Sequence, residues 1–105
     1  MSNDKKRLRE EFRMGVFARD FYKCVFCGIT SGLDAHHITD RNEMPNGGYV
    51  IENGITVCMV HHLECEKYHI TEGKEWVPGK HPDDLYRVIH SSKGIAFKKS
   101  EELGS

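Results

Sequence analysis

The stretch that decides the fold is residues 22–62, which read YKCVFCGITSGLDAHHITDRNEMPNGGYVIENGITVCMVHH. A pair of potential ligands stands near each end of it, Cys24-x-x-Cys27 and Cys58-x-x-His61, and both pairs have the same two-residue gap. Two such pairs, each on a tight turn, can close a tetrahedral zinc site from two directions. Four protein ligands leave no open position, so the sequence predicts a structural zinc ion rather than a catalytic one.

Two alternatives to this ligand set stay open. Cys65 could be the fourth ligand in place of His61, although the gap from Cys58 to His61 is the one that mirrors the first pair. The cysteines could also be small buried residues that bind no metal. Five of the seven histidines lie between residues 36 and 69, and in an intracellular chain such clustering favours metal over disulfides.

A strand is predicted over residues 33–38, and it carries two adjacent histidines, His36 and His37. Successive side chains of a strand point to opposite faces, so these two imidazoles cannot do the same job. One of them can bind a metal ion while the other faces a substrate water. An adjacent pair of exposed histidines with no function is the simpler interpretation of this motif alone.

A short helix is predicted over residues 59–69, and it places His62 and Glu66 on one face because they are four residues apart. His62 can join His36 in holding a second metal ion. Glu66 is placed to be a third ligand or to bind a metal-bound water, and His69 is a weaker candidate for the same position. For Glu66 and His69 the alternative is a plain exposed helix face.

The other elements are predicted from periodicity and turn residues. Leu8, Phe12 and Val16 recur at helical spacing in residues 5–20. Further along the chain we expect β-prone stretches at 49–51 and 55–57, a loop at 71–80, a helix at 83–90 and a frayed, charged remainder. Asn53 lies in the turn between the two β-prone stretches, where its side chain could satisfy local backbone or tie down the loop after His37.

Taken together, His37, Asn53 and His62 resemble the three signature residues of HNH endonucleases. The stretch 22–62 is similar to the zinc-knuckle branch of that family in the order of its elements: paired cysteines, a His-His-Ile run, a Gly-Gly loop, an asparagine, and a Cys-x-x-(Cys or His)-His run. The similarity extends from about Phe12 to His69. It implies an α+β chain with a small ββα-metal (His-Me finger) core, a structural zinc knuckle and flanking helices.

The resemblance implies a metal-dependent endonuclease that hydrolyses DNA phosphodiester bonds and leaves 5′-phosphate and 3′-hydroxyl ends. It implies that His37 is the general base and that Asn53 orients the loop. It also implies that His36 and His62 bind one catalytic divalent ion, which could be Mg²⁺, Mn²⁺, Ni²⁺ or Zn²⁺. A neutral imidazole with a pKa near the working pH can take a proton from an attacking water.

The sequence departs from the family pattern at two ligand positions. Members often have cysteine where this chain has His61, and a site of three cysteines and one histidine still binds zinc. The usual helix histidine four residues after His62 is absent and Glu66 stands there, which leaves the third catalytic ligand open between Glu66 and His69. A non-catalytic zinc-binding module for nucleic acid or protein is the alternative function, and a ribonuclease or another esterase are further ones.

Charge is unevenly distributed along a chain whose net charge is only −1. Residues 5–23 hold a local surplus of lysine and arginine that could meet phosphates. For substrate contact we expect Arg41, four residues after His37, and the basic helix with Arg9, Arg13 and Arg19. The alternative is an ordinary solvated helix face.

The length of 105 residues predicts one domain over 1–105, made of the basic helix 5–20, a zinc and ββα core at 21–70, and a C-terminal helix and tail at 71–105. No apolar run approaches the length that spans a bilayer, and no secretory or lipidation motif is visible. We therefore expect a cytoplasmic protein, and the resemblance to HNH endonucleases implies a prokaryotic or phage origin. Its expected partners are DNA and phage or defence-system proteins, with no membrane.

Overall fold

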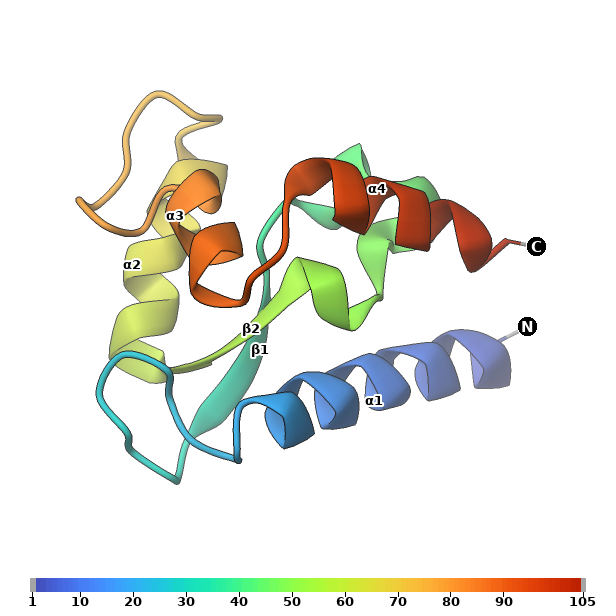
Figure 1. Ribbon diagram of the computed structural model, residues 1–105, viewed down its shortest axis with the longest axis horizontal. Helices are drawn as coiled ribbons and strands as arrows, with labels where there is room; N and C mark the ends of the chain where they lie inside the picture. The colour runs from blue at the N-terminus through green and yellow to red at the C-terminus, as the bar shows by residue number, and fades with distance from the viewer. Residues whose placement is uncertain (1, 105) are drawn as a thin grey trace.

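Two short antiparallel strands lie at the centre of the fold, β1 (Leu33–His37) and β2 (Gly54–Cys58). In this computed structural model, which describes residues 2–104, the strands are accompanied by α1 (Ser2–Arg19), α2 (Met59–Ile70), α3 (Pro82–Val88) and α4 (Lys93–Glu102). Three 3₁₀ turns carry the chain from β1 to β2: η1 (Arg41–Glu43), η2 (Pro45–Gly48) and η3 (Ile51–Asn53). The described chain is therefore α+β, as the sequence predicts (Figure 1).

The register of the two strands decides which histidine faces which helix. Leu33 pairs with Cys58 at one end and His37 with Gly54 at the other. Because side chains alternate along β1, the His36 ring reaches Glu66 on α2 while the His37 ring stacks on Phe12 of α1. The sheet is thus packed between α1 and α2, and every residue of β2 is buried.

Helix α1 begins and ends close to the prediction of 5–20 and buries Phe12, Val16 and Phe17. It lies very close to β2 at Gly54. An added Cβ at Gly54 would lie 2.5 Å from Val16 Cγ2 and 2.7 Å from Phe12 Cζ, so only glycine permits this approach. Neither α1 nor any other helix within residues 2–104 combines the length and apolarity needed to cross a membrane.

The stretch 49–51 is not a strand, and this prediction was wrong. Asn46 and Gly47 have positive φ angles of 54° and 82°, so the chain reverses instead of extending. The η3 turn follows, and the Asn53 backbone N–H donates to the Val50 carbonyl at 2.9 Å. The backbone groups of this segment therefore pair within a series of turns, and β2 has β1 as its strand partner.

The charged tail after residue 90, predicted to fray, instead forms α4. The Ser92 hydroxyl caps it by accepting a hydrogen bond from the Ile95 N–H at 3.1 Å. Ala96 and Ser100 are fully buried, and Asn46 Nδ2 donates to the Ser100 carbonyl at 2.9 Å. Packing against the turns between the strands stabilises α4. The sequence of α4 is only weakly amphipathic, so it does not by itself predict a packed helix.

The hydrophobic core lies where β1, β2 and α2 meet α3 and α4. Its buried members are Ile38, Met44, Ile55, Val57, Cys65, Leu85, Tyr86 and Ala96. Cys65 is 1% exposed, and burial raises the pKa of its thiol to about 12. A buried neutral thiol of this kind is a packing residue, which separates Cys65 from the other three cysteines.

Candidate metal centres

Three cysteines and one histidine, here called the knuckle cluster, converge where the loop after α1 meets the start of α2: Cys24, Cys27, Cys58 and His61. Cys58 Sγ lies 3.2 Å from His61 Nδ1, Cys24 Sγ lies 3.6 Å from the same nitrogen, and the Cys27 and Cys58 sulfurs are 3.8 Å apart. Tetrahedral zinc bonds of about 2.3 Å to sulfur and about 2.0 Å to nitrogen set ligand atoms about 3.3 to 3.8 Å apart. The cluster could therefore bind a metal such as zinc.

The backbone around the first cysteine pair forms the tight turn that the motif requires. Gly28 has a φ of 77°, its N–H donates to the Cys24 carbonyl, and the Cys24 N–H donates to the Ile29 carbonyl, both at 2.9 Å. The Val25 N–H donates to the Thr56 carbonyl at 3.1 Å, which fixes the turn to β2. All four cysteines are free thiols, so metal binding competes with no disulfide.

The neighbours of Cys58 lower the pKa of its thiol, which favours metal binding. A hydrogen bond from the backbone N–H of His61, followed by contact with the His61 ring, lowers the pKa of the Cys58 thiol to about 6. A thiolate is the form that binds zinc, so this sulfur is in its ligand form near neutral pH.

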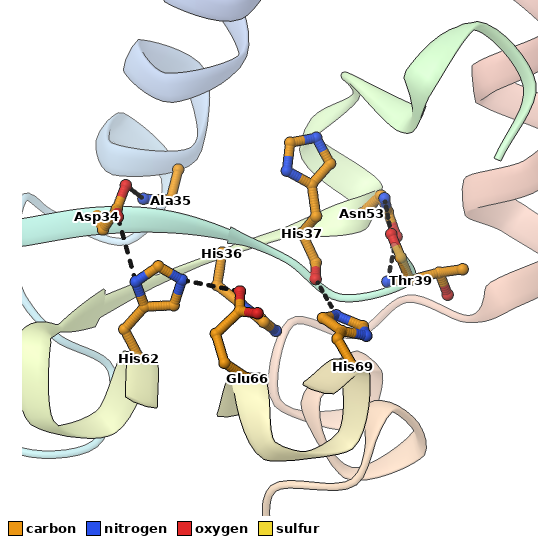
Figure 2. Close-up of polar contacts among 9 residues, drawn as sticks. All are labelled: Asp34, Ala35, His36, His37, Thr39, Asn53, His62, Glu66 and His69. Carbon is orange, nitrogen blue, oxygen red and sulfur yellow. Dashed lines mark hydrogen bonds and ion pairs between the residues drawn. The ribbon is translucent and has the colours of Figure 1, made fainter. Parts of the chain in front are cut away.

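A second group, here called the cleft cluster, consists of His36 on β1 with His62 and Glu66 on α2 (Figure 2). Glu66 Oε1 lies 3.2 Å from His36 Nδ1 and 3.1 Å from His62 Nε2. An ion bound about 2.0–2.2 Å from each atom sets nitrogen and oxygen ligands about 3 to 3.5 Å apart. The spacing and the mixture of imidazole and carboxylate both suit a divalent transition metal.

His36 is the residue in this cluster that most needs a partner. Its side chain is 1% exposed, and neither ring nitrogen makes a hydrogen bond within the described residues. The Glu66 oxygen is close to Nδ1 but outside hydrogen-bond geometry. Burial lowers the pKa of His36, so the imidazole is neutral, as a metal ligand must be. Since a buried polar atom without a partner is costly, these residues fit a metal ion.

Asp34 extends the cleft cluster, a role that the sequence analysis missed. Its Oδ2 lies 3.1 Å from His62 Nδ1, on the opposite side of the ring from Glu66 (Figure 2). Asp34 first and Glu66 second raise the pKa of His62 to about 9, so this ring carries a proton at neutral pH that a bound metal ion would have to displace. A carboxylate on the far nitrogen is the usual device that orients a metal-binding imidazole and increases its basicity. The available signal was the two-residue spacing from His36, which puts Asp34 on the same face of β1.

We therefore expect Asp34→Ala to weaken binding of an ion at the cleft cluster by about 10–100-fold, because the His62 ring loses its orienting partner. Asp34→Asn keeps a hydrogen-bond acceptor and should recover part of the loss. Calorimetric titration with Mn²⁺ or Ni²⁺ measures this, with the exposed Asp4→Asn on α1 as the control. Unchanged affinity in Asp34→Ala would remove Asp34 from the site.

The two clusters are adjacent along the chain, since His61 belongs to one and His62 to the other. No protein-family model, curated protein or solved structure matches this chain. Any assignment of function therefore rests on the residues themselves and on their geometry.

His37 lies on the other face of β1 from the cleft cluster (Figure 2). Its ring stacks on Phe12 with centroids 4.5 Å apart and meets the ring of Tyr49 edge-on at 4.9 Å. Burial, followed by the charges of His36 and Arg41, lowers the pKa of His37 to about 4. The imidazole is thus neutral at neutral pH, but its pKa is lower than the value near the working pH that the sequence analysis expects of a general base, because the ring is buried. It lines a cleft of about 300 Å³ together with residues of the cleft cluster.

Asn53 is buried and uses its whole side chain to hold the loop after His37. Its Oδ1 accepts from the Thr39 N–H at 3.0 Å, and its Nδ2 donates to the Thr39 and Gly48 carbonyls at 3.1 and 3.2 Å. The Tyr86 hydroxyl donates to the same Oδ1 at 2.7 Å and lies 2.6 Å from the Thr39 hydroxyl. Tyr86, on α3, was missed by the sequence analysis, which predicted a helix at 83–90 but gave none of its residues a role at the site.

The arginines predicted to contact substrate lie in different surroundings. Arg41 lines the cleft, whereas the Arg13 guanidinium lies over the Phe17 ring at 4.7 Å. Arg19 Nη1 donates to the Ile51 carbonyl at 2.6 Å, and Nη2 donates to the Gly54 carbonyl at 2.7 Å. Arg19 also pairs with Asp20, so the structure gives it contacts that attach the end of α1 to the sheet and does not bring it to the cleft.

His69 is held close to the cleft cluster but is not part of its ligand group. Its Nε2 donates to the His37 carbonyl at 2.9 Å, and its ring stacks on His36 at a centroid distance of 5.2 Å. Of the two candidates for the third ligand, Glu66 is therefore the one whose ligand atom lies with those of His36 and His62.

Proposed function

We propose that the chain is a metal-dependent endonuclease of the HNH type that hydrolyses phosphodiester bonds of DNA. In this proposal β1, β2 and α2 form a ββα-metal core, and the knuckle cluster holds a structural zinc ion. The observation that carries the proposal is the buried His36 ring, whose nitrogens have no hydrogen-bond partner and which lies against His62 and Glu66. A set of three donors, one buried and two half-buried at the edge of a cleft, leaves coordination positions open and so suits a catalytic ion better than a structural one.

His36, His62 and Glu66 would hold the divalent ion, with Asp34 keeping the His62 ring in position. An ion bound there would act as a Lewis acid, neutralising a phosphate oxygen and stabilising the charge that develops on the leaving 3′ oxygen. The protein supplies a fixed donor set on a strand and a helix, which are more rigid than loops.

His37 would take the proton from the attacking water. Its neutral state at neutral pH leaves a ring nitrogen free to accept a proton, and it lines the same cleft as His62 and Glu66. Asn53 holds the backbone that follows His37 through its two hydrogen bonds with Thr39, so the base would stay in place between turnovers.

The test is a cleavage assay on supercoiled plasmid with protein that carries zinc and has been dialysed free of other ions. Addition of Mg²⁺, Mn²⁺ or Ni²⁺ should convert the plasmid to nicked or linear DNA with ligatable 5′-phosphate ends. A parallel arm with single-stranded RNA distinguishes a ribonuclease. Absence of cleavage of either substrate with every ion would favour the alternative, a zinc-binding module without catalysis.

A further inference from the structure

A wide groove lies beside the proposed cleft, between the N-terminal half of α1, the turns that follow β1 and the end of α4. It encloses about 580 Å³. Figure 1 shows the first turns of α1 and the last turns of α4 towards the same end of the molecule, and residues of both segments line the groove. The groove is distinct from the cleft cluster and contains none of its ligands.

The groove is positively charged. Lys5, Arg9 and Arg41 line it, and no acidic side chain does. Lys5 and Arg9 are four residues apart on α1, so they share a face and repel each other in the absence of an anion. Within the part of the chain that the structure describes, none of the three forms a salt bridge, whereas Arg7 on the same helix contacts both Asp4 and Glu11.

The groove and the cleft are joined by Arg41, which lines both. Arg41 Nη1 donates to the Tyr49 hydroxyl at 3.3 Å, and the Tyr49 ring in turn contacts His37. A polyanion that lies in the groove would therefore reach the cleft at the residue proposed as the general base.

We propose that this groove binds the backbone phosphates of the nucleic acid next to the phosphodiester that is cut in the cleft. The proposal rests on the nuclease function. Phosphate groups suit the groove because two guanidinium groups and one ammonium group line it without a salt bridge within the described residues, and the side-chain amide of Asn42 is a further donor. The net charge of the whole chain is only −1, so electrostatic attraction to DNA would come from a local positive surface such as this groove.

The test compares two double variants of α1 that remove the same charge. The groove variant, Lys5→Gln/Arg9→Gln, removes the two positive charges that α1 contributes to the groove. The matched control, Lys6→Gln/Arg7→Gln, removes two positive charges of α1 that do not line it. Binding to a fluorescent DNA duplex is followed by anisotropy over a salt series. The protein carries zinc and the His37→Ala substitution, so that the DNA stays intact, and thermal unfolding checks that both variants fold.

We expect the groove variant to lower the slope of log affinity against log salt by about 1.8, since each lost phosphate contact contributes about 0.9. Its affinity should fall about tenfold at low salt, with a much smaller change in the control. Equal effects in the two variants, or no DNA binding by the parent protein, would overturn the groove proposal. Plasmid cleavage by the wild-type chain is measured separately. If the wild type cleaves but the two double variants bind DNA equally, the groove proposal fails and the nuclease function stands. If binding depends on the groove but no plasmid is cleaved, the nuclease function fails and the groove remains only a DNA-binding site.

Discussion

Removal of the metal from the knuckle cluster is expected to unfold the chain. Zinc binds to small structural sites with an apparent free energy of about 10–16 kcal/mol, whereas a domain of this size is stable by only about 5–15 kcal/mol. The cluster joins the turn after α1 to the end of β2 and the start of α2, so its loss would free three segments at once. The expected result is loss of the cooperative thermal transition, measured by circular dichroism after treatment with a zinc chelator.

Cys27→Ser provides the same test by mutation, because Cys27 is the exposed member of the cluster and its replacement disturbs no core packing. Zinc released from the wild-type protein is counted with a chromophoric indicator, and added zinc should restore the folded signal. A chelated protein that melts at the same temperature as the untreated one would mean that the knuckle cluster holds no structural metal.

Substitution of His37 is expected to abolish cleavage while both metal clusters stay intact. Loss of a general base typically lowers the rate by about 10²–10⁴-fold. His37→Gln keeps most of the volume between Phe12 and Tyr49 but cannot accept the proton from water, so it separates catalysis from packing better than His37→Ala does. The assay is the rate of plasmid nicking with saturating Mn²⁺.

The matched control is His90→Asn, which removes an exposed histidine that does not line the cleft. His90 has a φ of 56°, a conformation that asparagine tolerates. The control should cleave at the wild-type rate. If His37→Gln cleaved as fast as this control, the general base would have to be another residue.

The features that could be predicted from the sequence are those that depend on local spacing. The two-residue gap within each ligand pair was enough to predict the knuckle cluster. The alternation of side chains along a strand was enough to predict that His36 and His37 face opposite sides. The pairing of His62 with Glu66 follows from helical periodicity in the same way. Where the chemistry of a motif is carried by neighbours in sequence, short-range rules are sufficient.

The features that escaped prediction depend on contacts between distant residues. Tyr86 reaches Asn53 across 33 positions of sequence, and the turn residues of segment 46–51 fold around that same asparagine. Helix α4 forms because Ala96 and Ser100 are buried against the turns between the strands, which a weakly amphipathic sequence does not reveal. Arg19 is of a residue type that often binds phosphate, yet its guanidinium donates hydrogen bonds to the backbone carbonyls of Ile51 and Gly54.

The most direct test of the account counts metal ions per chain and relates them to activity. Wild-type protein and His62→Ala are dialysed, analysed for zinc, titrated with Mn²⁺ and assayed on plasmid at each point. We predict one retained zinc in both proteins, one further ion in the wild type alone, and cleavage that rises with that ion. Equal Mn²⁺ binding in the two proteins, or wild-type cleavage that does not depend on it, would contradict a catalytic ion held by His36, His62 and Glu66.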